Sequence, residues 1–203
     1  MLETMLDRFS CYLVSIQAAK EEDREVVAYG LFRVVSLAIQ YTLLIIPSLF
    51  LGCLPEIMSF TLMFAALKRY AGGTHASRYW RCLTTFTVLA YAASFILRFV
   101  PEFITSYVSI SLTLTALVIV LLRAPVIHPN NPKSPRRKKQ LRRKAVLIAL
   151  TQTVIILICL LFVPLWADLY ILCGASGGFA AAFTLILPMP PMEGGGNDEE
   201  ISL

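Results

Sequence analysis

Two residues, His75 and Cys82, have the types and the closeness in sequence that nucleophilic catalysis needs. A cysteine attacks as its thiolate, and a histidine that titrates near neutral pH can take the thiol proton and return it to a leaving group. The other histidine, His128, stands in a proline-rich stretch with no cysteine near it. The spacing alone is weakly specific, because cysteines are often buried packing residues. It nevertheless marks residues 68–82 as the candidate catalytic segment.

The seven-residue spacing limits how this pair can meet. On one straight helix the two Cα atoms would lie about 10.5 Å apart, and both side chains would tilt toward the same end. We therefore expect either a bend in the chain between His75 and Cys82 or a pairing across a homodimer. Gly72-Gly73, just before the histidine, favours an irregular entry into the segment.

The composition places this segment in a membrane protein. Of the 203 residues, 57% are hydrophobic and 15% are charged, whereas soluble domains carry about 25% charged residues. Soluble, disordered and collagen-like chains are excluded on the same grounds. The five cysteines have no metal or redox spacing, which argues against a disulfide framework or a zinc site. We expect an all-α polytopic bundle with no metal and no organic cofactor.

Six apolar stretches separated by short polar breaks predict about six transmembrane helices. A span needs about 20 residues, and the six candidates are 34–54, 57–67, 83–97, 103–122, 145–166 and 169–188. The second and third are short, so a tilted or re-entrant pair is an alternative there.

The rest of the chain is expected to complete a single domain, 1–203. Residues 1–25 predict an amphipathic cytoplasmic segment that lies on the membrane surface or packs on the bundle. Its apolar stripe is formed by Leu2, Leu6, Phe9, Leu13 and Ile16. Residues 123–144 predict a polybasic loop, and residues 189–203 predict a flexible tail.

The distribution of lysine and arginine along the chain predicts the orientation of the protein in the membrane. With the N-terminus inside, seventeen of the 18 basic residues fall on one side of the membrane and only Arg98 falls on the other. Basic residues favour the cytoplasmic side. Both termini, the 68–82 segment and the 123–144 loop are therefore expected at the cytoplasmic face of a multi-pass membrane protein. A nucleic-acid partner is not expected, because the basic stretch lacks interleaved aromatic residues and is held at the bilayer.

The residues around the histidine resemble a known family. Arg69-x-x-Gly-Gly-x-His75-Ala-x-x-x-x-x-Cys82, in a six-span chain of 203 residues, is similar to the accessory gene regulator protein B (AgrB) family. These are membrane cysteine endopeptidases that process the precursors of quorum-sensing peptides. The likeness includes the amphipathic start and the polybasic loop. It implies that Cys82 is the nucleophile and His75 the general base, and that an AgrD-type pro-peptide is cut through an acyl-enzyme on the way to a cyclic (thio)lactone.

The sequence leaves two interpretations open for each of two features, the basic run and the Asn130-Asn131 pair. The basic run can set topology against anionic lipid, or it can dock an acidic tail of the pro-peptide; its residues are Arg136, Arg137, Lys138, Lys139, Arg142, Arg143 and Lys144. Asn130 and Asn131 can orient the imidazole or serve only as turn residues.

The rival function is a non-catalytic peptide transporter or scaffold. The absence of charged residues at the middle of the predicted spans argues against an ion-coupled transporter.

Overall fold

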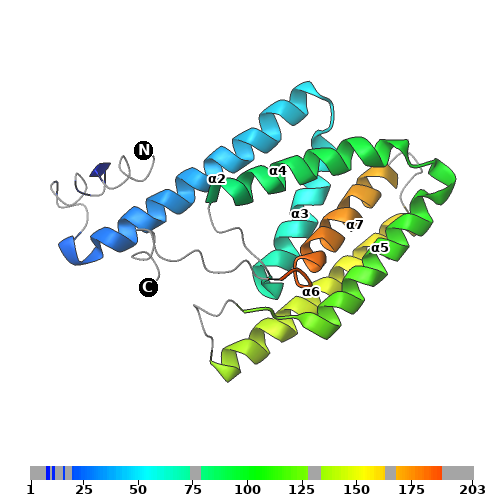
Figure 1. Ribbon diagram of the computed structural model, residues 1–203. Coiled ribbons are helices and arrows are strands. Elements are labelled where there is room, and N and C mark those ends of the chain that lie inside the picture. Colours follow the sequence, from blue (N-terminus) through cyan, green and yellow to red (C-terminus); the bar gives the residue numbers. More distant parts are fainter. Residues whose placement is uncertain are drawn as a thin grey trace. The chain divides into compact units, whose positions relative to one another are not determined.

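A computed structural model describes residues 8, 9, 11, 16, 20–73, 79–127, 134–162 and 168–188. Apart from one isolated parallel bridge between Gly72 and Val126, these residues form helices, turns and irregular connections. The expected all-α class is confirmed (Figure 1). The described elements are η1 (Glu21–Asp23), α2 (Arg24–Phe50), α3 (Leu54–Ala71), α4 (Tyr79–Ile96), η2 (Leu97–Phe99), α5 (Glu102–Arg123), α6 (Pro135–Phe162) and α7 (Asp168–Phe183).

Among the residues that the structure describes, four helical segments are long and apolar enough to cross a membrane: α2, the Trp80–Phe99 segment, α5 and α6. The apolar helix α7 is shorter, at 16 residues. Helix α3 has 18 residues but carries one acidic residue in its first turn and two basic residues in its last. Large apolar side chains cover the outside of these helices, as Leu122 and Phe162 show with 77% and 80% of their surface exposed. A bilayer is the medium in which such a surface is stable, so the chain is a membrane protein.

The structure falls into two compact units, one of residues 1–46 and 192–203 and one of residues 47–191. In the first unit, η1 and most of α2 are described, together with a few residues of the predicted amphipathic segment. Most of that segment, and the predicted tail, lie outside the described residues. The second unit holds α3 to α7 and both ends of the predicted catalytic segment.

Helix α7 forms the centre of the second unit, where it packs against both α3 and α5 (Figure 1). Its small residues make this close packing possible. A Cβ atom on Gly177 would overlap the Phe60 carbonyl oxygen of α3, and one on Gly174 would lie 3.5 Å from Met63. Small residues let helix backbones approach closely in a membrane. The glycines of α7 therefore serve packing within the chain.

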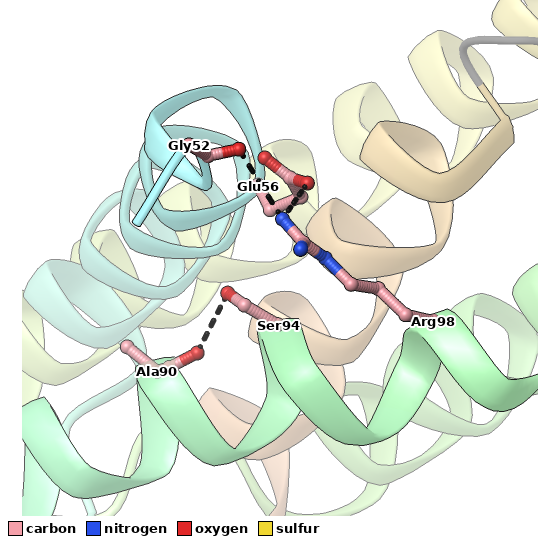
Figure 2. Close-up of polar contacts among 5 residues, drawn as sticks. All are labelled: Gly52, Glu56, Ala90, Ser94 and Arg98. Atoms are coloured by element: carbon pink, nitrogen blue, oxygen red, sulfur yellow. Dashed lines mark hydrogen bonds and ion pairs between the residues drawn. The ribbon is translucent and has the colours of Figure 1, made fainter. Parts of the chain in front are cut away.

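One end of this unit carries an ion pair. Arg98 Nη2 donates to Glu56 Oε1 across 2.8 Å and to the Gly52 carbonyl oxygen across 3.3 Å. Figure 2 shows Arg98 reaching from the end of the α4 segment to the beginning of α3. The Glu56 side chain is only 5% exposed. The one basic residue predicted on the far side of the membrane thus has an acidic partner at the same end of the bundle.

The polybasic segment differs from its prediction as a loop over 123–144. Residues from Pro135 onward form the first turns of α6, so the connection after α5 is shorter than expected. The Arg137 amide donates to Ser134 Oγ across 3.4 Å, which caps the helix. Ser at the N-cap with Pro at N1 is a strong helix start, and lysine and arginine are good helix formers. Hydropathy locates the apolar stretch from residue 145 onward, but it does not reveal that the helix already begins at Pro135.

Candidate functional site

Helix α3 ends where the glycine pair begins. Gly72 has φ +75° and Gly73 has φ +102°, in the left-handed region that side chains with a Cβ avoid. The Val126 amide donates to the Ala71 carbonyl oxygen across 3.0 Å, and the Gly73 amide donates to the Val126 carbonyl oxygen across 3.3 Å. A Cβ on Gly72 would overlap that same Val126 oxygen. Both glycines are therefore needed for the end of α3 to meet the segment after α5.

The last turn of α3 is also tied to the turn after α7. Lys68 Nζ donates a hydrogen bond to Thr184 Oγ1 across 2.7 Å, and Thr184 Oγ1 donates to the Ala181 carbonyl oxygen across 2.7 Å. An ideal Cβ on Gly73 would lie 2.5 Å from Thr184 Oγ1 and 3.1 Å from Lys68 Nζ. The lysine ammonium thus lies directly beside the backbone that leads into the segment containing the predicted histidine.

Helices α3 and α4 approach each other one turn away from this lysine. The Phe64 and Phe86 rings have centroids 4.8 Å apart, and Phe60 also contacts Phe86 at 6.1 Å. On a helix, residues four apart lie on the same face. Lys68 follows Phe64 by four residues on α3, and Cys82 precedes Phe86 by four on α4. The aromatic contact therefore lies one helical turn from Lys68, toward the end of α3, and one helical turn from Cys82, toward the beginning of α4.

Electrostatics agree with this placement. Lys68 lies past the apolar stretch of α3 and is half-buried. Burial of the ammonium lowers the pKa of Lys68 to about 8, and the nearby Cys82 acts in the opposite direction and raises it. Cys82 itself is exposed, so its sulfur is accessible to a substrate at this end.

The other cysteines have different surroundings. Cys53 and Cys173 are buried, Cys159 is intermediate, and Cys11 is exposed in the other unit. Cys82 is therefore the exposed thiol among the described cysteines of the second unit. Within the described ranges, no three His, Cys, Asp or Glu residues come together as metal ligands.

The basic residues of α6 reach the same end of the bundle. All seven predicted residues from Arg136 to Lys144 are exposed. Gln140, Arg143, Lys144 and Leu147 line an open depression, and their spacing puts them on one helix face. The Lys144 ammonium also lies 5.6 Å from the centroid of the Tyr70 ring, which places the start of α6 beside the end of α3. A cationic surface therefore adjoins the Lys68–Cys82 region.

Several predicted residues lie outside the described ones. These are His75, Asn130 and Asn131, so the pairing of His75 with Cys82 and the orienting amide stay predictions. Glu56 lies at the opposite end of α3 from Lys68. Twelve residues of helix separate them, or about 18 Å.

Sequence reasoning missed Lys68 and Thr184 as members of the site. Lys68 was counted only as one of the charges that set topology, and its neighbour Thr184 is 116 residues away. The available signal was weak: Lys68 lies seven residues before the histidine, at the end of an apolar stretch. Nothing local marks Thr184, because its role depends on how α7 packs.

Comparison with known proteins identifies the family of the chain. The family model of accessory gene regulator B matches residues 6–185, which is most of the chain. No curated protein and no solved structure matched. The matched range includes the whole 68–82 segment and all the helices described here. The chain therefore belongs to the accessory gene regulator B family, whose members act with the AgrD pro-peptide in processing a quorum-sensing peptide.

Proposed function

We propose that this protein is a membrane cysteine endopeptidase that cuts the C-terminal part from a quorum-sensing pro-peptide. Cys82 is the nucleophile and His75 is the general base and acid. The observation that supports this most directly is the position of Cys82. It is an exposed thiol in the first turn of α4, close enough to Lys68 to affect that lysine electrostatically, and it lies in the segment that resembles the catalytic segment of the family.

The reaction has two bond exchanges. In the first, His75 takes the Cys82 proton, the thiolate attacks a backbone carbonyl carbon of the pro-peptide, and the C–N bond breaks. The proton passes from His75 to the leaving amine, and a thioester joins Cys82 to the N-terminal piece. In the second exchange, a cysteine thiol of that piece attacks the thioester. Its proton returns to Cys82, and a cyclic thiolactone is released.

Because one thioester replaces another in the second exchange, its equilibrium lies near balance. The first exchange replaces a peptide bond with a thioester, so removal of the leaving peptide or of the product is needed to pull the reaction forward. Exclusion of water from the acyl-enzyme favours cyclisation over hydrolysis. Leu83 and Phe86 are buried near the beginning of α4. Their apolar side chains shelter one side of the thioester from water.

The basic surface of α6 is proposed to bind an acidic part of the pro-peptide. Arg143 and Lys144 line the depression described above, and the remaining basic residues surround the same two or three turns of helix. Charge-assisted contacts of this kind attract a carboxylate-rich segment and fix its register. We place the site and both termini at the cytoplasmic face, since basic residues favour that side. Anionic lipid headgroups are expected at the same surface, and a homodimer stays an expectation.

Co-expression with a pro-peptide tests the proposal. Cleavage of the precursor is followed by mass spectrometry in membranes that contain the parent protein, Cys82→Ser or His75→Ala. We expect cleavage only with the parent. Cys159→Ser is the matched control, because it removes a thiol of the same unit that is less exposed and carries no proposed role. Cleavage that survives both Cys82→Ser and His75→Ala would show that the chain acts as a binding or transport protein instead.

A further inference from the structure

A small cavity lies inside the second unit, where α3, α5, α6 and α7 meet (Figure 1). It offers about 20 Å³ to the centre of a water molecule. One buried water needs about 10–15 Å³ on this measure, together with two to four polar partners. Most of the lining is apolar or glycine, and the polar residues in it are Thr113, Gln152 and Thr153. The proposed peptidase chemistry uses none of the three.

The hydroxyl of Thr113, on α5, is buried and has no hydrogen-bond partner among the residues that the structure describes. A threonine in a helix can donate to the carbonyl oxygen four residues earlier. Thr105, Thr115 and Thr153 do so, across 3.1, 2.7 and 2.8 Å. Thr113 does not take this option within the described part of the chain, so its hydroxyl hydrogen is available to a partner in the cavity. A buried hydroxyl that stays unpaired is destabilising.

Gln152, on α6, supplies an acceptor to the same cavity. Its Nε2 donates to the Met63 carbonyl oxygen of α3 across 2.8 Å. Because a carbonyl oxygen can only accept, this bond fixes the amide nitrogen toward Met63 and turns Oε1 away from it. A Cβ atom on Gly178 of α7 would lie 3.5 Å from Oε1. Gly178 also lines the cavity, so the Gln152 oxygen faces a helix position that carries no side chain.

Thr153 adds a second acceptor. Its hydroxyl hydrogen is donated to the Ala149 carbonyl oxygen across 2.8 Å, so the oxygen keeps lone pairs that can accept. The three polar side chains of the lining thus offer one hydrogen and two acceptors. A water molecule that accepts once and donates twice matches this set.

We propose that the cavity is a binding site for one structural water molecule. The water accepts from the Thr113 hydroxyl and donates to Gln152 Oε1 and to the Thr153 hydroxyl oxygen. It joins α5 to α6 and, through the hydrogen bond from Gln152 to Met63, to α3. Thr113 and Gln152 lie in the middle of predicted spans, where polar groups must find their partners inside the protein. The site does not depend on the proposed peptidase function.

Thermal unfolding in lipid nanodiscs tests the inference through the sign of one substitution. Thr113→Val keeps the shape of the side chain and removes its hydroxyl. If the hydroxyl binds a water that also binds Gln152, the midpoint of unfolding falls by about 3 °C. An unpaired hydroxyl predicts the opposite, because an apolar group of the same shape is then neutral or stabilising. A midpoint that is unchanged or raised in Thr113→Val overturns the inference.

Thr61→Val is the matched control. Thr61 is 7% exposed, as Thr113 is, and its hydroxyl is likewise without a partner among the described residues. Thr61 does not line the cavity. Its replacement should therefore leave the midpoint unchanged or slightly raised. Equal falls in the two variants overturn the inference, because the cavity would then account for neither.

A double variant tests the bridge between Thr113 and Gln152. Gln152→Met removes one acceptor of the water, so the further change Thr113→Val should lower the midpoint by less than about 1 °C in that background. A fall as large as in the parent background overturns the inference, since Thr113 would then bond within its own helix. A crystal structure of the parent protein from a lipid phase decides the matter if Gln152→Met does not fold. Density for one water within hydrogen-bond distance of Thr113 Oγ1 and Gln152 Oε1 supports the site, and a dry cavity overturns it.

Discussion

The ammonium of Lys68 and the hydroxyl of Thr184 join two helix ends that are 116 residues apart in sequence, across 2.7 Å. The same hydroxyl is the atom closest to the position that a Cβ on Gly73 would occupy. One hydrogen bond therefore links three features: the glycine that precedes the predicted histidine, the last turn of α3, and the end of α7. A disturbance of any one of them is expected to disturb the other two.

Replacement of Gly73 by alanine is expected to displace Lys68. The new Cβ would lie 2.5 Å from Thr184 Oγ1 and 3.1 Å from Lys68 Nζ, and the backbone would keep φ at +102° only under strain. A non-glycine residue in such a conformation costs about 1–3 kcal/mol. We expect a lower midpoint of thermal unfolding in nanodiscs and slower cleavage of the pro-peptide, since Gly73 leads into the predicted catalytic segment. Gly30→Ala is the control, since nothing lies within 4 Å of its Cβ position.

The Gly30→Ala control lies inside a helix, where alanine is preferred over glycine by up to about 1 kcal/mol. It should therefore leave the unfolding midpoint unchanged or slightly raised. If Gly73→Ala behaved like Gly30→Ala in both measurements, the tight contact among Gly73, Thr184 and Lys68 would be wrong.

The ion pair at the other end of the bundle predicts an asymmetric loss of stability. The Glu56 side chain is 5% exposed, while that of Arg98 is 35% exposed. Removal of one partner of a buried pair costs up to about 3–5 kcal/mol, because a buried charge is left without compensation. Arg98→Met leaves the buried carboxylate alone and should lower the unfolding midpoint more than Glu56→Gln does. The double variant should recover part of the loss, and equal losses in the two single variants would contradict this account.

Much of the fold could be predicted from the apolar stretches and their breaks. The beginning of α5 at Glu102 lies within one residue of the predicted span, and α7 begins at Asp168, one residue before the predicted one. Hydropathy locates such boundaries because it measures the main force that places a helix in a bilayer. The start of α6 was misplaced by ten residues, since a capped basic helix extends beyond the membrane and hydropathy does not register it.

The site could be predicted only in part. Cys82 could be proposed because its type and its distance from His75 are local properties of the sequence. The glycine pair was recognised as a source of irregular backbone, but its partners, Val126 and Thr184, come from distant segments. Lys68 was assigned to topology for the same reason. Its relation to Cys82 depends on how α3 packs on α4 and α7, and no pattern within one segment contains that information.

The basic face of α6 is expected to affect substrate affinity more than the chemical step. Arg143 and Lys144 are exposed and line the depression beside Gln140 and Leu147. Exposed ion pairs contribute about 0.2–1 kcal/mol each, so reversal of both charges should weaken binding of an acidic pro-peptide by about tenfold. Arg143→Glu with Lys144→Glu should therefore raise KM about tenfold and leave kcat within about twofold. Binding of a labelled pro-peptide to the same double variant in a Cys82→Ala background gives the affinity directly.

Two comparisons distinguish an effect of charge from an effect of shape at this face. Arg143→Lys with Lys144→Arg keeps both charges and should bind the pro-peptide like the parent. It also keeps a cation at position 144, where the Lys144 ammonium of the parent lies 5.6 Å from the centroid of the Tyr70 ring. A pro-peptide whose acidic residues are replaced by lysine should bind the charge-reversed protein better than it binds the parent. Added salt should weaken binding to the parent more than binding to the reversed variant, because exposed charges are screened over about 10 Å at 0.1 M salt. A fall in kcat at unchanged KM would instead place these residues in the chemical step, and an unchanged affinity would leave the basic face with its topological role alone.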